Sequence, residues 1–411
     1  MNLLYNFSVL IAQYLLKFIA LFNKKIDLFV EGRKQTFKVL QQNISKTDEV
    51  IWMHAASLGE FEQGRPIIEK LKAKFPTKKI VVTFFSPSGY EVRKNYNLAN
   101  VVCYLPLDTK QNMKQFIKLL HPEIAILVKY EFWPNLLTQL QNDNIKTILV
   151  SGIFRENQPF FNWYGSFLRN KLKAFNHFFV QDPNSKKLLH SIGFNNVTVS
   201  GDTRFDRVFE ITQQNNNLPF IEEFTNGKHL VVAGSTWEKD EEFLVKYINN
   251  KATSEEKFVI APHNINNSDI IKLKKAINKP TVCFSEKENK NLKNYQVFIA
   301  DTIGILTKIY SYANVAYVGG GFTKSGVHNT LEAATFNIPI IIGPNYNKFK
   351  EVKDLIADEA CFSIDKYKKL YLLLEKFYSQ PTLRKKAGEQ ALNYVVSNKG
   401  ATEKILNYIA K

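Results

Sequence analysis

The sequence contains few cysteines, and their number and spacing argue against a disulfide framework or a zinc site. Cys103, Cys283 and Cys361 are spread over 411 residues, and each lies in or beside an apolar stretch. An odd number of isolated cysteines is typical of free thiols in a reducing compartment. We therefore expect buried free thiols.

The chain also lacks the signatures of nucleic-acid binding, although it is strongly basic. Its formal net charge is +17, and lysine supplies most of the excess. Zinc-finger spacing, an RNA-binding aromatic signature and a long basic run are all missing. An anionic membrane surface or an anionic lipid substrate accounts for the charge equally well. We therefore expect no nucleic-acid partner.

The length of 411 residues is large for one hydrophobic core and predicts two domains. Short apolar runs alternate with helical patterns on both sides of a polar stretch at residues 206–228. This alternation predicts an α/β protein with two parallel, doubly wound sheets. We place an N-terminal domain at residues 26–215, and a C-terminal domain with a helical tail at residues 216–411. The expected strands are residues 50–55, 79–85, 101–105, 124–129, 146–151, 177–181, 229–233, 257–261, 281–284, 295–300, 315–318 and 339–342.

Residues 1–25 are expected to form a separate membrane-anchor helix. Apolar residues dominate this segment, and three amides and Lys17 fall on one narrow helical stripe. About 20 helical residues measure roughly 30 Å, enough to cross a bilayer, but the polar stripe favours a helix that lies in the membrane interface. Lys24 and Lys25 follow and indicate a cytoplasmic body. The alternative is a soluble amphipathic helix docked on the first domain.

Residues 51–60 place a carboxylate at the junction between a strand and a helix. The apolar run ends in small residues, and a helical pattern begins near Phe61. Such junctions are where α/β proteins bind ligands. Glu60 lies there, close to His54, Ser57 and Gly59, and its carboxylate can take a proton from a hydroxyl group. Ser57 and Glu60 also fit a capping box, which is the commoner use of this spacing.

A second junction carries a glycine run at residues 319–321, followed by Asn329 and Glu332. Glycines at a strand end allow a phosphate to approach, and N–H groups at a helix start bind it. Glu332 can accept hydrogen bonds from a ribose diol. The alternatives are an N-cap for Asn329 and dipole complementation for Glu332.

Taken together, these motifs resemble the 3-deoxy-D-manno-octulosonic acid (Kdo) transferases of lipopolysaccharide synthesis. The resemblance covers nearly the whole chain and implies a GT-B architecture, with two Rossmann-like domains facing a cleft. It also implies an enzyme that moves Kdo from CMP-Kdo to an anionic lipid A precursor (lipid IVA). The enzyme would work at the cytoplasmic face of the bacterial inner membrane. The matching segments are residues 52–60 (Trp-Met-His-Ala-Ala-Ser-Leu-Gly-Glu), 129–135 (Lys-Tyr-Glu-Phe-Trp-Pro-Asn) and 328–332 (His-Asn-Thr-Leu-Glu).

The resemblance assigns roles to particular residues. The glutamate that closes the first motif is the proposed general base of the family, which points to Glu60. Glu131 is expected at the acceptor site, in catalysis or in its structure, or else as an exposed acid at a helix start. Ser57, Gly59, Ser235 and Thr236 are expected to line the acceptor site or the cleft. The implied contacts to CMP are Pro262, His263, Ile303, Gly304, Ile305, Asn329, Thr330, Leu331 and Glu332.

No cofactor is implied, and no Asp-x-Asp pair lies near the expected donor site. Metal-independent transfer with inversion is therefore expected. The chain departs from the family pattern at His263, where an arginine is common, at Ile305, where a glutamate is common, and at Val327, where a glycine is common. One alternative is another GT-B enzyme with a UDP-sugar donor and a lipid acceptor. The other is a nucleotide-binding or lipid-binding protein without turnover.

Overall fold

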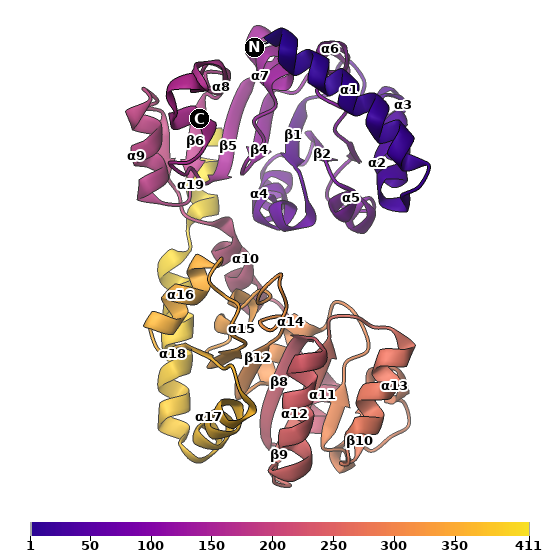
Figure 1. Ribbon diagram of the computed structural model, residues 1–411, viewed down its shortest axis with the longest axis vertical. Helices are drawn as coiled ribbons and strands as arrows, with labels where there is room; N and C mark the ends of the chain where they lie inside the picture. The colour runs from indigo at the N-terminus through magenta and orange to yellow at the C-terminus, as the bar shows by residue number, and fades with distance from the viewer. Residues whose placement is uncertain (1, 411) are drawn as a thin grey trace. The chain divides into compact units, whose positions relative to one another are not determined.

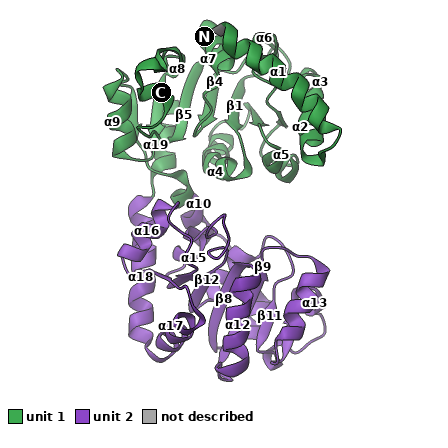
Figure 2. Cartoon of the chain, in the orientation of Figure 1, with its two compact units in different colours: residues 1–206, 399–411 green, residues 207–398 purple. Residues whose placement is uncertain are grey.

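The computed structural model describes residues 2–410, and it divides the chain into two compact units (Figure 2). Unit 1 extends to Asp206 and resumes at Lys399, while unit 2 comprises residues 207–398. Met1 of the expected anchor and Lys411 of the expected tail lie outside the described residues. The three cysteines are free and buried, as expected.

Unit 1 is built on a seven-stranded, wholly parallel sheet with the strand order β3-β2-β1-β4-β5-β6-β7 (Figure 1). The strands are β1 (Val50–Ala55), β2 (Lys79–Phe84), β3 (Val101–Tyr104), β4 (Ile124–Val128), β5 (Lys146–Gly152), β6 (His177–Val180) and β7 (Val197–Val199). The helices are α1 (Asn2–Ala20), α2 (Lys24–Lys34), α3 (Thr36–Asn43), α4 (Leu58–Lys74), α5 (Pro87–Arg93), α6 (Lys110–Leu120), α7 (Pro134–Asn142), α8 (Ser166–Leu172), α9 (Pro183–Ser191) and α19 (Ala401–Ile409). The first six positions of this strand order are those of the Rossmann fold.

Unit 2 has a second seven-stranded parallel sheet, with the order β10-β11-β9-β8-β12-β13-β14. Its strands are β8 (His229–Thr236), β9 (Glu256–Pro262), β10 (Thr281–Cys283), β11 (Val297–Ile299), β12 (Val315–Val318), β13 (Ile340–Ile342) and β14 (Cys361–Ser363). Its helices are α11 (Pro219–Thr225), α12 (Glu238–Asn250), α13 (Asn267–Ala276), α14 (Leu306–Ile309), α15 (Leu331–Ala334), α16 (Lys350–Ala357), α17 (Tyr367–Ser379) and α18 (Pro381–Asn398), while α10 (Thr203–Thr212) crosses the boundary between the units. The expected pair of Rossmann-like domains is confirmed.

Both faces of each sheet are covered, which explains why the strands are almost continuously apolar. In β1, Trp52 packs into the core on one face, with Phe116 of α6 and Leu136 of α7. Met53 packs into the core on the other face, with Phe61 and Ile67 of α4. Because successive side chains of a strand point to opposite faces of the sheet, the single apolar run of β1 contributes to two cores.

In each sheet the order in which strands are added reverses at one pair of central strands. Parallel α/β proteins bind ligands at the carboxyl ends of such a pair. In unit 1 this pair is β1 and β4, and in unit 2 it is β8 and β12. The expected site residues Glu60 and Glu131 follow β1 and β4. Thr236 ends β8, and the glycine run 319–321 follows β12.

The C-terminal tail differs from the expected domain organisation. We assigned residues 216–411 to one domain, but α19 packs against α4 of unit 1. Ile405 and Leu406 are buried in the same core as Phe61. The carboxylate of Asp206 also accepts the backbone N–H groups of Gly400 (2.5 Å) and Thr402 (2.7 Å). The apolar face of α19 therefore belongs to unit 1, and the expected linker at 206–228 is largely the helices α10 and α11.

Candidate functional site

Glu60 lies in the first turn of α4, directly after the carboxyl end of β1. Its Oε2 atom accepts the backbone N–H of Ser57 at 3.1 Å, which is half of the capping box. The side chain is half-buried, and burial raises the pKa of Glu60, as does the nearby charge of Glu131. Lys129 and His54 oppose this rise. Glu60 therefore combines a capping contact with the environment of a proton acceptor.

His54, on β1, is held by a buried chain of hydrogen bonds. Its Nε2 atom lies 2.8 Å from Oε2 of Glu131, and its Nδ1 atom lies 2.8 Å from the hydroxyl of Thr83. Trp52 donates its indole N–H to the same hydroxyl at 2.9 Å. Because an ionised carboxylate can only accept, Nε2 of His54 donates to Glu131, while Nδ1 faces both the hydroxyl and the carbonyl oxygen (3.1 Å) of Thr83.

Glu131 is buried, with an exposed fraction of 4%, and also accepts the indole N–H of Trp133 at 2.5 Å. This placement differs from an exposed acid at a helix start. Its two donors orient the carboxylate, and its charge acts on Glu60. Glu131 is thus a positioning group in this arrangement.

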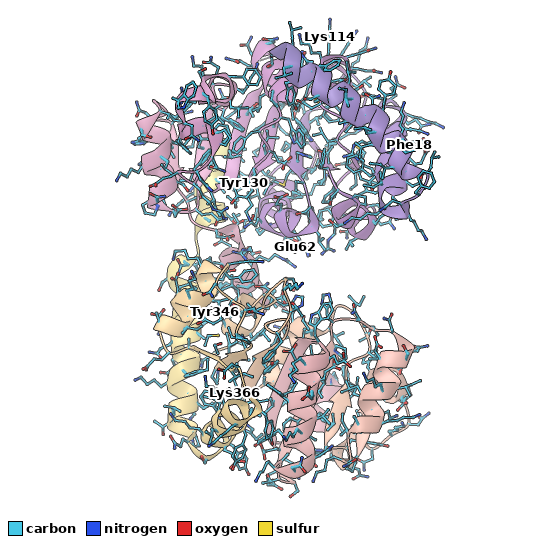
Figure 3. All side chains as sticks on the ribbon, viewed as in Figure 1. Phe18, Glu62, Lys114, Tyr130, Tyr346 and Lys366 are labelled. Atoms are coloured by element: carbon cyan, nitrogen blue, oxygen red, sulfur yellow. The ribbon has the colours of Figure 1, made fainter. Side chains whose placement is uncertain are left out.

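Lys129 follows β4 directly and adopts a left-handed backbone conformation with φ +71°, which is uncommon for a lysine. The next residue, Tyr130, is labelled in Figure 3. Lys129 also lies close enough to Glu60 to lower its pKa. Such strain at the carboxyl end of a central strand is typical of ligand sites.

Ser57 and Gly59 begin α4 beside Glu60. Ser57 is the N-cap residue, and Gly59 is exposed. A Cβ atom added at Gly59 would meet nothing within 4 Å. The fold therefore leaves open space above the first turn of α4.

In unit 2, the rings of Trp237, His263 and His328 lie against one another at the ends of β8, β9 and β12. The ring of His263 stacks on Trp237, with centroids 4.7 Å apart, and on His328 at 4.5 Å. Trp237 donates its indole N–H to Nε2 of His328 at 2.9 Å. That nitrogen must therefore be unprotonated, and burial also lowers the pKa of His328. His263 is exposed and forms the accessible edge of this ring cluster.

The glycine run has a structural explanation that the sequence did not reveal. A Cβ atom at Gly319 would lie 2.3 Å from the carbonyl oxygen of Ser235, and one at Gly321 would lie 2.6 Å from the backbone of Gly343. The N–H of Gly320 donates to Asp240, which is buried and also accepts the Tyr317 hydroxyl. The glycines therefore allow close backbone packing among the loops that carry the site. Ser235 itself has φ +54°.

Glu332 connects two of the expected donor segments. It accepts the side-chain N–H of Asn329 at 3.0 Å and the hydroxyl of Thr307 at 3.2 Å. The loop of residues 303–305, which precedes α14, is thereby brought beside residues 329–332. The side-chain oxygen of Asn329 also accepts the backbone N–H of Leu331 at 3.2 Å, although the N-cap residue of α15 is Thr330.

The remaining expected donor residues differ in accessibility. Ile303 and Gly304 are exposed, and Ile305 is half-buried. Leu331 is fully buried, so only its backbone can meet a ligand. The buried hydroxyl of Thr330 has no hydrogen-bond partner in the described part of the chain. The helix α15 has only four residues, so its dipole is small.

Thr236 and Pro262 border a groove of about 850 Å³ between α12 and α13. Trp237 and Glu241 also line it, and Glu241 accepts the Thr236 hydroxyl at 2.9 Å. Burial raises the pKa of Glu241. Because Trp237 belongs to both, the groove adjoins the ring cluster.

Sequence reasoning missed several residues that build these sites. Trp237 and Asp240 were not singled out, although an aspartate three residues after an N-cap position is a capping signal. Thr83 could not have been found, because nothing in its own segment indicates a contact to His54. Lys129 lies inside a recognised motif, and its strained backbone appears only in the structure.

Comparison with known proteins shows which family the chain is similar to. The family model described as 3-deoxy-D-manno-octulosonic-acid transferase (kdotransferase) matches residues 31–207. A 3-deoxy-D-manno-octulosonic acid transferase of Aquifex aeolicus is 28% identical over 323 residues, covering 78% of this chain and 83% of its own length. A bifunctional glycosyltransferase/methyltransferase of Fusobacterium nucleatum is 26% identical over 84% of this chain, which spans only 56% of that relative.

Solved structures share the fold at low identity. The UDP-GlcNAc 2-epimerase of Neisseria meningitidis aligns with a TM-score of 0.59 at 13% identity, covering 88% of this chain and 99% of its own. MurG of Acinetobacter baumannii aligns with a TM-score of 0.53 at 11% identity, with the same two coverages. These neighbours confirm the GT-B class of fold. The chain is thus similar to 3-deoxy-D-manno-octulosonic acid transferases, through the family model at residues 31–207 and through relatives along most of its length.

Proposed function

We propose that the protein transfers Kdo from CMP-Kdo to a primary hydroxyl of a lipid A precursor such as lipid IVA. The observation that carries this proposal is the half-buried carboxyl group of Glu60, beside the His54–Glu131 pair at the central strands of unit 1. A carboxylate with a raised pKa is a better base for a hydroxyl than an ordinary surface carboxylate. Similarity to the Kdo transferases supports Kdo as the transferred sugar.

In the proposed reaction, Glu60 takes the proton of the acceptor hydroxyl as its oxygen attacks the anomeric carbon of Kdo. A new C–O bond forms, the bond from that carbon to the CMP phosphate oxygen breaks with inversion, and CMP leaves as an anion. Glu131 and His54 are positioning residues, because both are buried and act through Glu60. Ser57 and Gly59 border the acceptor hydroxyl. We expect the reaction to need no metal ion.

The donor is proposed to bind in unit 2, along the carboxyl ends of β8, β9 and β12. Glu332 and Asn329 would hold the ribose, and the exposed His263 would meet the base or the phosphate. The unpartnered hydroxyl of Thr330 and the loop of residues 303–305 complete the proposed contacts with Pro262, Ser235, Thr236 and the backbone of Leu331. Because α15 is short, we assign the leaving anion mainly to loop N–H groups and the ring cluster.

The first helix supports a membrane-bound enzyme. Residues 3–20 have a mean hydropathy of 1.5 and are not buried within the protein. Phe18, labelled in Figure 3, is 63% exposed. The residues of α1 that are partly covered include Tyr5, Val9 and Leu16, which share one helical face. We therefore propose an interfacial helix at the cytoplasmic face of the inner membrane, with its apolar side in the lipid.

A transfer assay tests the proposal. The full chain is mixed with tetra-acylated lipid A precursor and CMP-Kdo generated in situ, and the products are read by mass spectrometry. Mass gain by one or more Kdo units, with and without a chelator, is expected. Mass gain only with a UDP-sugar would establish the alternative GT-B function. Binding of nucleotide and lipid without any product would establish the non-catalytic alternative.

A further inference from the structure

Arg33, near the end of α2, is a buried cation that has no anionic partner within the described residues. Its exposed fraction is 8%, and it contacts no carboxylate among residues 2–410. Its guanidinium donates to the carbonyl oxygens of Phe29 (2.7 Å) and Phe85 (2.5 Å), and its Nε atom has no partner. Buried charges in proteins are normally paired, because an unpaired one costs several kcal/mol. An arginine in this state indicates that something anionic completes its surroundings.

The guanidinium is held in place by aromatic rings. It lies 3.5 Å from the ring centroid of Phe29, 4.8 Å from that of Phe85 and 5.1 Å from that of Tyr104. Ring faces stabilise a cation but do not neutralise it. Burial accordingly lowers the pKa of Arg33 to about 9, and the only charge interaction that opposes this is with the Tyr104 phenol. The side chain is thus fixed, charged at neutral pH and without a counter-ion.

Arg33 lines a pocket of about 230 Å³ that is bordered by α1, α2 and the loop after β3. Gln13 and Lys17 of α1 form one wall, and Arg33 and Lys34 of α2 form another. Apolar side chains complete the lining, among them Leu16 and Phe37. The pocket therefore combines cationic groups with apolar walls, and the helix that we place on the bilayer forms part of its lining.

A line of contacts connects this pocket to the proposed acceptor site. Phe85, which accepts a hydrogen bond from Arg33, stacks on Trp133 with ring centroids 4.6 Å apart. Trp133 donates to Glu131, whose charge raises the pKa of Glu60. Two stacked rings, those of Phe85 and Trp133, therefore connect Arg33 to Glu131 at the proposed acceptor site.

We propose that this pocket, named here the Arg33 pocket, binds a phosphate monoester group carried by a lipid. The Arg33 guanidinium and the Lys17 ammonium contact the phosphate, and the apolar walls contact the adjoining lipid. The phosphate can belong to the acceptor glycolipid, in which case the proposal deepens the proposed function. It can also belong to an anionic phospholipid of the membrane, and the experiment separates the two sources.

The first test measures binding without any donor or turnover. The full chain in neutral detergent is titrated with dihexanoyl phosphatidic acid, and dihexanoyl phosphatidylcholine serves as the neutral comparison. We expect saturable binding of the phosphatidic acid only, weakened at least about tenfold by Arg33→Gln. The matched control is Arg169→Gln, because Arg169 also donates to two backbone carbonyls, those of Phe160 and Asn162, but lies outside the pocket. Equal affinity for wild type and Arg33→Gln would overturn the proposal.

A second variant keeps the test informative if Arg33→Gln fails to fold. Leu16→Trp fills the pocket from α1, where Leu16 is half-buried, and leaves Arg33 unchanged. We expect it to melt like the wild type and to lose affinity for the phosphatidic acid. Unchanged affinity in Leu16→Trp would contradict the pocket as the binding place.

A kinetic comparison then assigns the source of the phosphate. If it belongs to the acceptor, Arg33→Gln raises KM about tenfold for the phosphorylated precursor and leaves KM for a dephosphorylated precursor unchanged. If it belongs to bulk lipid, both KM values stay unchanged, and co-sedimentation with vesicles containing phosphatidic acid falls instead. Failure of Kdo transfer in the wild type would refute the proposed function alone, because the binding test does not depend on it.

Discussion

Nε2 of His54 lies 2.8 Å from Oε2 of Glu131, although 77 residues separate the two in sequence. Both side chains are buried, and they come from neighbouring strands at the centre of the sheet in unit 1. The pair fixes a negative charge near Glu60 without exposing that charge to solvent. The carboxyl group that we propose as the proton acceptor thus lies beside a charge that raises its pKa.

Replacement of Glu60 by glutamine should abolish transfer while preserving the fold. Loss of a general base typically lowers the rate by about 10²–10⁴-fold. The folded pKa of Glu60 is raised, so ionisation of this group opposes folding once the pH exceeds that pKa. Glu60→Gln should therefore melt at the same or a higher temperature at pH 7. Single-turnover mass spectrometry and thermal melts check both parts, and full turnover in this variant would remove Glu60 from the base role.

The pH dependence of kcat/KM should change when the charged residues next to Glu60 are replaced, because their charges shift the pKa of Glu60. A base works when ionised, so the rate should fall as the pH falls through the raised pKa of Glu60. Glu131→Gln removes a charge that raises this pKa, so the acidic limb should move to lower pH. Lys129→Met removes a charge that lowers it, so the limb should move to higher pH. If the acidic limbs of Glu131→Gln and Lys129→Met both shifted in the same direction, the result would contradict this explanation.

The hydroxyl of Thr83 should be essential to the buried hydrogen-bond chain. Thr83→Val keeps the shape of the side chain but leaves the Trp52 indole and the Nδ1 atom of His54 without this partner. An unsatisfied buried polar group costs about 1–3 kcal/mol. We expect denaturant titrations to show a loss of this size. Thr83→Ser retains the hydroxyl and is the matched control.

Two glycines should respond in opposite ways to an added methyl group. Gly319→Ala would place Cβ 2.3 Å from the Ser235 carbonyl oxygen, so loop displacement and weaker CMP binding are expected. Gly59→Ala meets no atom within 4 Å and replaces a helical glycine, which favours folding by up to about 1 kcal/mol. If the acceptor approaches Gly59 closely, that variant should retain CMP affinity and raise KM for the lipid. Calorimetric titration of CMP and acceptor kinetics distinguish the two effects.

The two sides of α1 should have separable roles. The Tyr5 hydroxyl donates to Asp108 at 2.8 Å, and Asp108 also accepts the backbone N–H of Asn135 at 2.9 Å. Tyr5→Phe should therefore cost about 0.5–1.5 kcal/mol of stability and leave vesicle binding unchanged. Phe7→Asp alters a side chain that is 62% exposed, so it should reduce vesicle co-sedimentation at an unchanged melting temperature. The reverse pattern would contradict an interfacial helix.

Much of the fold follows from local patterns, because every central strand is a short apolar run bounded by polar turns. The strands that the sequence did not predict are β7 and β14, which lie at the sheet edges and have three residues each. Runs this short do not differ from apolar loops in sequence. The motif positions of Glu60 and Asn329 were found because each follows a strand. The contacts of Thr83 and Arg33 depend on segments far apart in the chain, and no local pattern encodes such contacts.

The return of α19 to unit 1 has a consequence for biosynthesis. Ile405 and Leu406 complete a core that also contains Met53 and Phe61, yet the ribosome makes them after the whole of unit 2. During translation, unit 2 can close its own core while unit 1 still exposes apolar surface along α4. The core of the unit that carries Glu60 is therefore completed only when the last helix has been made, and apolar surface left uncovered until then favours aggregation.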